Sequence, residues 1–147
     1  MDIKSNVGSG SIYIGDSVGR VSVAGSDHNT YLGYQSGYSN TTGSSNVFIG
    51  RQSGYTNSTG IENVFIGYKA GRLNISNNQS VYIGLQSGEQ SASNLNTYVG
   101  ALSGLINTSG NENTFIGAYS GWQNISSNAN TFVGVRAGLM NTGTGNV

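Results

Sequence analysis

Few residues of this chain have side chains suited to catalysis or metal binding, and their spacing keeps them apart. Glu62 and Glu112 hold equivalent places three repeats apart, about 14 Å if each repeat forms one β coil, which is too far for a glycosidase carboxylate pair. We expect His28, the single histidine, to lie on a surface turn. The remaining carboxylates are too few for a calcium site. We therefore expect a protein that is not an enzyme and carries no metal and no cofactor. The six acidic residues are Asp2, Asp16, Asp27, Glu62, Glu89 and Glu112.

Three aromatic side chains are candidates for binding a ligand. Tyr38, Tyr55 and Trp122 recur at one variable position, directly after a glycine that every repeat shares. Because aromatic faces offer a large contact area, residues at this position are suited to stacking on sugar rings. They would equally suit a groove between associated chains, and the sequence leaves both interpretations open.

Asparagine recurs at a second position, and five of these residues begin an Asn-x-Ser/Thr sequence, as does Asn78. One interpretation is a set of N-glycan acceptor sites. The favoured one is a ladder of stacked asparagines that hydrogen-bond from coil to coil. The recurring residues are Asn40, Asn57, Asn74, Asn107, Asn124 and Asn141.

All these residues except Asp2 belong to an internal repeat of roughly 17 residues, which is the feature that decides the fold. Residues 1–10 form a lead-in, and residues 11–147 form an array of eight units. The consensus is N-[TV]-[FY]-[IV]-G-x-x-[SA]-G-x-x-N-x-[ST]-G-x-x. Residues 145–147 resemble the opening of another unit, so we expect the array to be cut within a further repeat of a longer chain. The units start at residues 11, 29, 46, 63, 80, 96, 113 and 130.

Glycine occupies positions 5 and 9 in all eight units. Because glycine reaches positive φ and lets backbones approach closely, we interpret these positions as two corners of a coil. We expect a third corner, formed by left-handed turn residues, at Gly43, Gly60, Asn77, Asn94, Gly110 and Ser127.

Positions 2 to 4 of each unit favour a short β-strand. A helix is excluded, since each interior glycine would cost about 1 kcal/mol relative to alanine. Stacked units would pair these strands in parallel, about 4.8 Å apart, and eight of them would make a rod roughly 38 Å long. The predicted fold class is therefore all-β, a parallel β-solenoid or β-roll with one coil per repeat.

Side chains alternate across a strand, so position 3 faces opposite to positions 2 and 4. We assign the aliphatic position 4 to the interior, which places the aromatic position 3 outside. An exposed stack of aromatics usually marks an interface, and we expect an obligate homotrimer. The alternative is that the aromatics fill the coil and the aliphatics face out. The expected interface residues are Phe48, Phe65, Tyr82, Tyr98, Phe115 and Phe132.

The charge composition excludes some partners. Six basic and six acidic residues give a net charge of zero, and no basic stripe is present to bind nucleic acid. The sequence contains no apolar run of about 18 residues, so we expect no membrane insertion.

The repeats resemble those in the head domains of trimeric autotransporter adhesins and in tail fibres of phages and large DNA viruses. The resemblance covers residues 11–147 and implies a left-handed parallel β-roll that forms trimers outside the cell, on a virion fibre or a cell surface. The matching runs are NTYLGYQSG, NVFIGRQSG, NVFIGYKAG, SVYIGLQSG, NTYVGALSG, NTFIGAYSG and NTFVGVRAG.

The expected function is that of a structural and adhesive fibre module, a stiff trimeric rod or head that attaches to a host glycan, receptor or surface. One alternative is a carbohydrate-binding module that uses Tyr38, Tyr55 and Trp122. A second is an ice-binding solenoid, although valine and isoleucine interrupt its threonine column, which contains Thr30, Thr97, Thr114 and Thr131.

Overall fold

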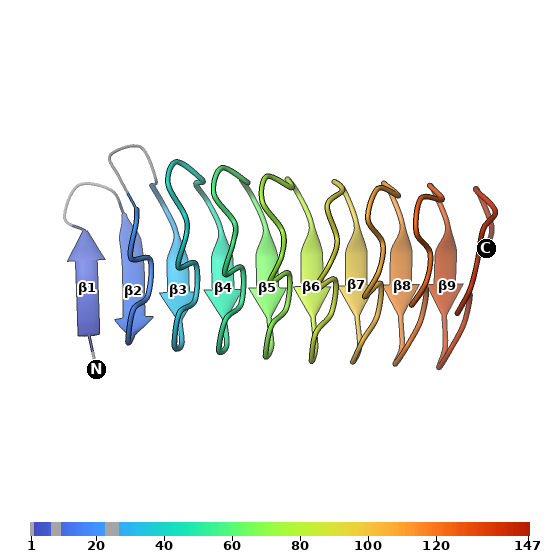
Figure 1. The fold of residues 1–147 in the computed structure, drawn as a ribbon, viewed down its shortest axis with the longest axis horizontal. Coiled ribbons are helices and arrows are strands. Elements are labelled where there is room, and N and C mark those ends of the chain that lie inside the picture. The colour runs from blue at the N-terminus through green and yellow to red at the C-terminus, as the bar shows by residue number, and fades with distance from the viewer. Residues whose placement is uncertain (1, 7–9, 23–26) are drawn as a thin grey trace.

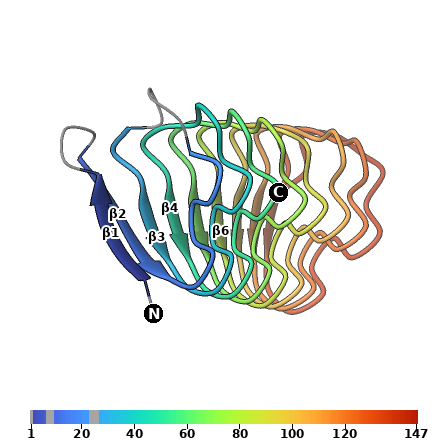
Figure 2. The same cartoon turned by 60° about the vertical axis from the view of Figure 1, so that its left-hand side comes forward.

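The computed structural model describes residues 2–6, 10–22 and 27–147, the first of these segments by its backbone only. Eight parallel strands, β2 to β9, stack in sequence order along a rod (Figure 1). Each repeat contributes one strand, and its remaining residues complete the coil and lead into the next strand (Figure 2). The predicted all-β parallel solenoid is confirmed, and the described residues contain no helix.

The strands are short because a glycine follows each aliphatic residue at position 4. Equivalent residues pair across neighbouring strands, as Tyr31 does with Phe48 and Phe48 with Phe65. The parallel strands are β2 (Ser11–Gly15), β3 (Thr30–Leu32), β4 (Val47–Ile49), β5 (Val64–Ile66), β6 (Val81–Ile83), β7 (Thr97–Val99), β8 (Thr114–Ile116) and β9 (Thr131–Val133).

The lead-in contains a strand that the sequence did not predict. Strand β1 (Asp2–Asn6) pairs with β2 in the antiparallel direction, with Lys4 opposite Tyr13. It covers the N-terminal edge of the sheet, which would otherwise present unpaired backbone groups. Residues 23–26 of the first unit lie outside the described residues.

The two invariant glycines meet different neighbours. At position 5, Gly50 has a φ of +129°, and a Cβ there would lie 2.5 Å from the carbonyl oxygen of Gly67 in the next coil. At position 9, Gly54 has a φ of +57°, and a Cβ would lie 2.5 Å from Cδ2 of Phe48 in its own coil. One glycine therefore permits the coils to stack, and the other makes room for the ring.

The third corner differs from the prediction. Gly43, Gly60 and Gly110 are not in the left-handed region. Left-handed residues instead occupy positions 7 and 17, where they are not glycine; Gln52 has a φ of +57° and Glu62 a φ of +60°. The glycine at Gly43 serves close packing instead, because a Cβ there would lie 2.5 Å from the carbonyl oxygen of Gly60.

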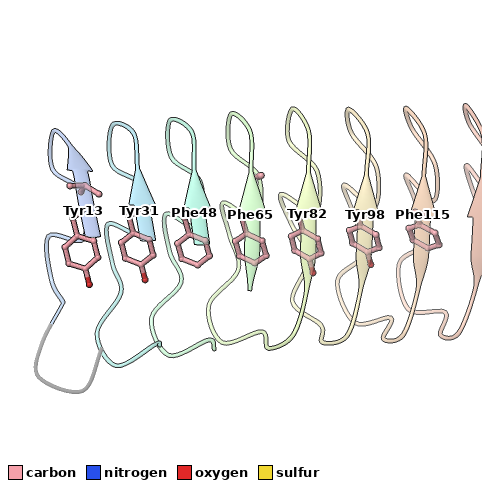
Figure 3. Packing of buried hydrophobic residues seen from close by; sticks show 9 residues of the cluster. Tyr13, Tyr31, Phe48, Phe65, Tyr82, Tyr98 and Phe115 are labelled. Atoms are coloured by element: carbon pink, nitrogen blue, oxygen red, sulfur yellow. The ribbon is translucent and has the colours of Figure 1, made fainter. Parts of the chain in front are cut away.

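The aromatic column at position 3 lies inside the coil, so the prediction that it faces outward is wrong. Its rings stack along the rod (Figure 3), with centroids 4.7 to 5.3 Å apart. These side chains are fully buried within one chain from Tyr31 to Phe115, and Phe132 in the last strand is partly buried. They therefore do not form the predicted intermolecular interface. The residues concerned are Phe48, Phe65, Tyr82, Tyr98, Phe115 and Phe132.

The rest of the interior is polar and hydrogen-bonded. At position 1, the backbone N–H of Asn46 donates to Oδ1 of Asn29 in the preceding coil, at 2.9 Å, while Asn46 Nδ2 donates to the carbonyl of Gly60 at 2.8 Å. At position 8, Ser53 Oγ donates to the carbonyl of Phe65 at 2.8 Å. Rings and polar ladders together fill the coil, which leaves the aliphatic residues outside.

Candidate binding surfaces

The outward face of the sheet is uncharged. It consists of positions 2 and 4 of strands β2 to β9, all of which are Val, Ile, Leu or Thr. Many of these side chains are half-buried by their neighbours, while Leu32, Ile83 and Ile116 are between 36% and 43% exposed. Eight strands in register thus present a regular apolar face, here called the sheet face.

Tyr38 and Tyr55 are brought together, but in a way that covers their rings. The two rings stack on each other with centroids 5.0 Å apart. Arg20 lies over Tyr38 and donates to its hydroxyl at 3.0 Å, and Arg72 lies over Tyr55 with Cζ 5.8 Å from the ring centre. Four side chains therefore form one stacked row, and the ring faces suited to sugars are already occupied.

Trp122 is not part of this row. It occupies the same position four coils further along, about 19 Å from Tyr55 by strand spacing, between the leucines of the neighbouring units. Its side chain is half-buried. The three residues predicted to bind carbohydrate therefore do not form a common site.

A second aromatic and cationic cluster lies at positions 6 and 7, which the sequence analysis did not single out. The guanidinium of Arg51 lies between the rings of Tyr34 and Tyr68, with Cζ 5.8 Å from each ring centre. Nζ of Lys69 lies 5.1 Å from the centre of the Tyr68 ring. The signal that would have revealed this cluster is the alternation of Tyr34, Arg51 and Tyr68 at a spacing of one repeat.

The acidic residues are dispersed. Glu89 is buried, and its Oε1 lies 3.6 Å from Nη1 of Arg72. Its Oε2 accepts a hydrogen bond from Nε2 of Gln86. Glu62 is exposed and accepts a hydrogen bond from Gln79 at 2.9 Å. His28 is exposed. Within the described residues, no three His, Cys, Asp or Glu side chains gather as ligands of one metal ion.

Two interior tyrosines have hydroxyls that are held by their own coils. Tyr82 shares a hydrogen bond of 2.8 Å with Ser91, and Tyr98 accepts one from Asn107. Burial raises the pKa of both phenols above its ordinary value. These hydroxyls therefore stay protonated in the folded chain and act as structural groups.

The recurring asparagines at position 12 are buried from Asn40 to Asn124. Most of their bonds close a turn within one coil: Gly60 N–H donates to Asn57 Oδ1 at 3.1 Å, and Asn107 Nδ2 donates to the carbonyl of Gly110 at 2.7 Å. The ladder that runs from coil to coil is at position 1 instead. A buried asparagine has no room for an attached glycan, and of the predicted acceptors only Asn78 is partly exposed.

In the part of the chain that the structure describes, we find no helix of the length and apolar character needed to span a membrane.

We compared the chain with protein-family models, with curated proteins and with solved structures, and none of the three comparisons gave a match.

Proposed function

We propose that this chain is a structural and adhesive module, a stiff rod that carries attachment surfaces on a fibre outside the cell or on a virion. The observation that supports this proposal is the continuity of the interior. The ring stack runs from Tyr13 to Phe132 without a break, and the position 1 ladder runs beside it. Each coil is packed against its neighbours, as in other solenoids, while positions 6 and 10 change in residue type from unit to unit.

The proposed rod is a homotrimer that associates through the sheet face. The aromatic ladder is no longer available for this contact, because it is buried inside each chain. The sheet face is the remaining regular apolar surface, with no charged residue at positions 2 or 4 of any strand. Uncharged apolar faces of this kind mark interfaces more often than free surfaces.

Sedimentation equilibrium tests this association. The chain should sediment at three times its mass of 15.2 kDa. A Val64→Glu, Ile66→Glu double variant should sediment as a folded monomer, because it places two charges on the sheet face. Ile75→Glu is the matched control, since Ile75 is 62% exposed at a corner, and it should remain trimeric. A wild-type chain that stays monomeric at high concentration contradicts the trimer.

One observation favours ice binding as a second candidate. Thr97, Thr114 and Thr131 pair in register on the outward side of β7 to β9. They form a short, regular row of hydroxyls beside the aliphatic residues at position 4. Thermal hysteresis should then be measurable and should disappear in a Thr114→Lys variant. Its absence in the wild-type chain excludes this candidate.

A further inference from the structure

We propose that the cluster of Tyr34, Arg51, Tyr68 and Lys69 binds an acidic polysaccharide, through its carboxylate or sulfate groups. The proposal rests on the adhesive function suggested above and specifies the class of ligand. It assigns this role to residues at positions 6 and 7, in place of Tyr38, Tyr55 and Trp122.

The first argument is the geometry around Arg51. Tyrosine rings from the preceding and following coils lie on both sides of its guanidinium. An arginine held in this way loses little side-chain freedom on binding, and its N–H groups form a planar fork that suits carboxylate or sulfate. Tyr34 and Tyr68 are 43% and 39% exposed, so the cluster is open to solvent.

The second argument is uncompensated charge. Within the described residues, Arg51 and Lys69 have neither an ion pair nor a hydrogen bond to a carboxylate. Arg72, by contrast, is paired with Glu89, and Arg20 donates to Tyr38. Positions 6 and 7 of the seven later units contain no acidic residue at all. An anionic partner would therefore meet attraction without a neighbouring repulsion.

The third argument concerns the kind of anion. Beside the cluster, Gln52 Nε2 donates to Gln35 Oε1 at 3.0 Å, which leaves the Gln35 amide N–H and the Gln52 carbonyl oxygen to bind hydroxyl groups. The row Tyr34, Arg51, Tyr68 runs along the rod in steps of about 4.8 Å, which suits an extended polymer. The cluster contains two cations, on a chain of zero net charge, which are too few for nucleic acid, whose binding depends on many phosphate contacts.

The test measures binding of the full chain to polygalacturonate and dextran sulfate, with neutral dextran as the reference polymer. The wild-type chain should bind one or both acidic polymers and not the neutral one. An Arg51→Gln, Lys69→Gln variant should bind about tenfold more weakly, as expected for the loss of two charge-assisted hydrogen bonds. Arg20→Gln, Arg72→Gln loses the same charge at position 10, away from the cluster, and should bind within about twofold of wild type.

A second variant separates a built site from simple charge attraction. Tyr34→Ala, Tyr68→Ala keeps every charge but removes the rings that hold Arg51, and it should also weaken binding several-fold. Three results would overturn the proposal: no binding of either acidic polymer, an equal loss in the Arg20, Arg72 control, or competition by duplex DNA as strong as that by the acidic polymers. Sedimentation and thermal melting of the same samples show separately whether the proposed rod is intact.

Discussion

The interior ladder and the sheet face come from the same strands, yet they follow opposite rules. In β5, Phe65 is fully buried against the rings of the neighbouring coils, while Val64 and Ile66 on either side of it face outward and are partly exposed. Position 3 is aromatic in every unit, whereas position 2 is threonine in some units and valine or isoleucine in others. The interior requires an aromatic ring, and the exterior accepts threonine or any of several aliphatic residues.

The comparison predicts that adjacent residues differ sharply in their effect on stability. Phe65→Ala should lower the free energy of unfolding by about 3 to 5 kcal/mol, because it opens a cavity in the ring stack. Ile66→Ala should cost about 1 kcal/mol in the monomer, where that side chain already faces water. Urea denaturation at a concentration that gives monomers measures both values, and equal losses would contradict the assignment of faces.

The position 5 glycines offer a test of coil stacking. Gly50→Ala would place a methyl group against the carbonyl of Gly67, whereas at Gly134, in the last coil, the nearest atom lies 3.9 Å away. The backbone φ is similar, +129° and +131°, so both variants carry the same local strain. Gly50→Ala should be less stable than Gly134→Ala by about 2 kcal/mol. Similar thermal melting of the two would show that close stacking is not the reason for this glycine.

Buried and surface asparagines should also differ in how much they stabilise the fold. Asn113 Oδ1 accepts from the backbone N–H of Asn130, and its Nδ2 donates to the carbonyl of Ser127, all within the buried interior. Asn113→Ala removes the acceptor of both the backbone N–H and Nδ2 of Asn130 and should cost about 2 kcal/mol. Asn111 accepts from the Asn94 N–H near the surface, where water can replace it, so Asn111→Ala should cost less than about 1 kcal/mol. Chemical denaturation measures the difference, and a reversed order would contradict it.

The smallest expected effect is a gain in stability. In the coil of Tyr98, the phenol oxygen accepts from Asn107 Nδ2, but in the coil of Phe65 the equivalent Asn74 Nδ2 is buried without a partner. Phe65→Tyr should supply the missing acceptor and stabilise the chain by about 1 kcal/mol.

Phe115→Tyr is the control for that gain, because Asn124 Nδ2 already donates to the carbonyl of Ser127 at 2.9 Å. It should change the melting temperature less than Phe65→Tyr does. If Phe65→Tyr instead destabilises the chain, the coil has no space for the hydroxyl.

The solenoid could be predicted from the sequence because its spacing and its glycines leave few alternatives. The direction of the strand faces could not, since hydrophobicity alone does not rank Phe65 against Ile66. The evidence that decides it is Gly71, where a Cβ would lie 2.5 Å from the Phe65 ring; the aromatic and the glycine are six residues apart and form one packing unit. The sequence shows that Tyr38 and Tyr55 occupy the same repeat position. The arginines that cover their rings come from other units, so the contacts can be identified only once the coils are stacked in register.

Thiol labelling tests the central claim, the inward direction of position 3, most directly. The chain contains no cysteine, so Phe65→Cys and Ile66→Cys each introduce a single reactive group. At a concentration where sedimentation gives monomers, the thiol of the partly exposed Ile66→Cys should react with a soluble maleimide while the chain stays folded. The thiol of Phe65→Cys should react only as the chain unfolds. Rapid labelling of folded Phe65→Cys, with Ile66→Cys protected, would contradict the account.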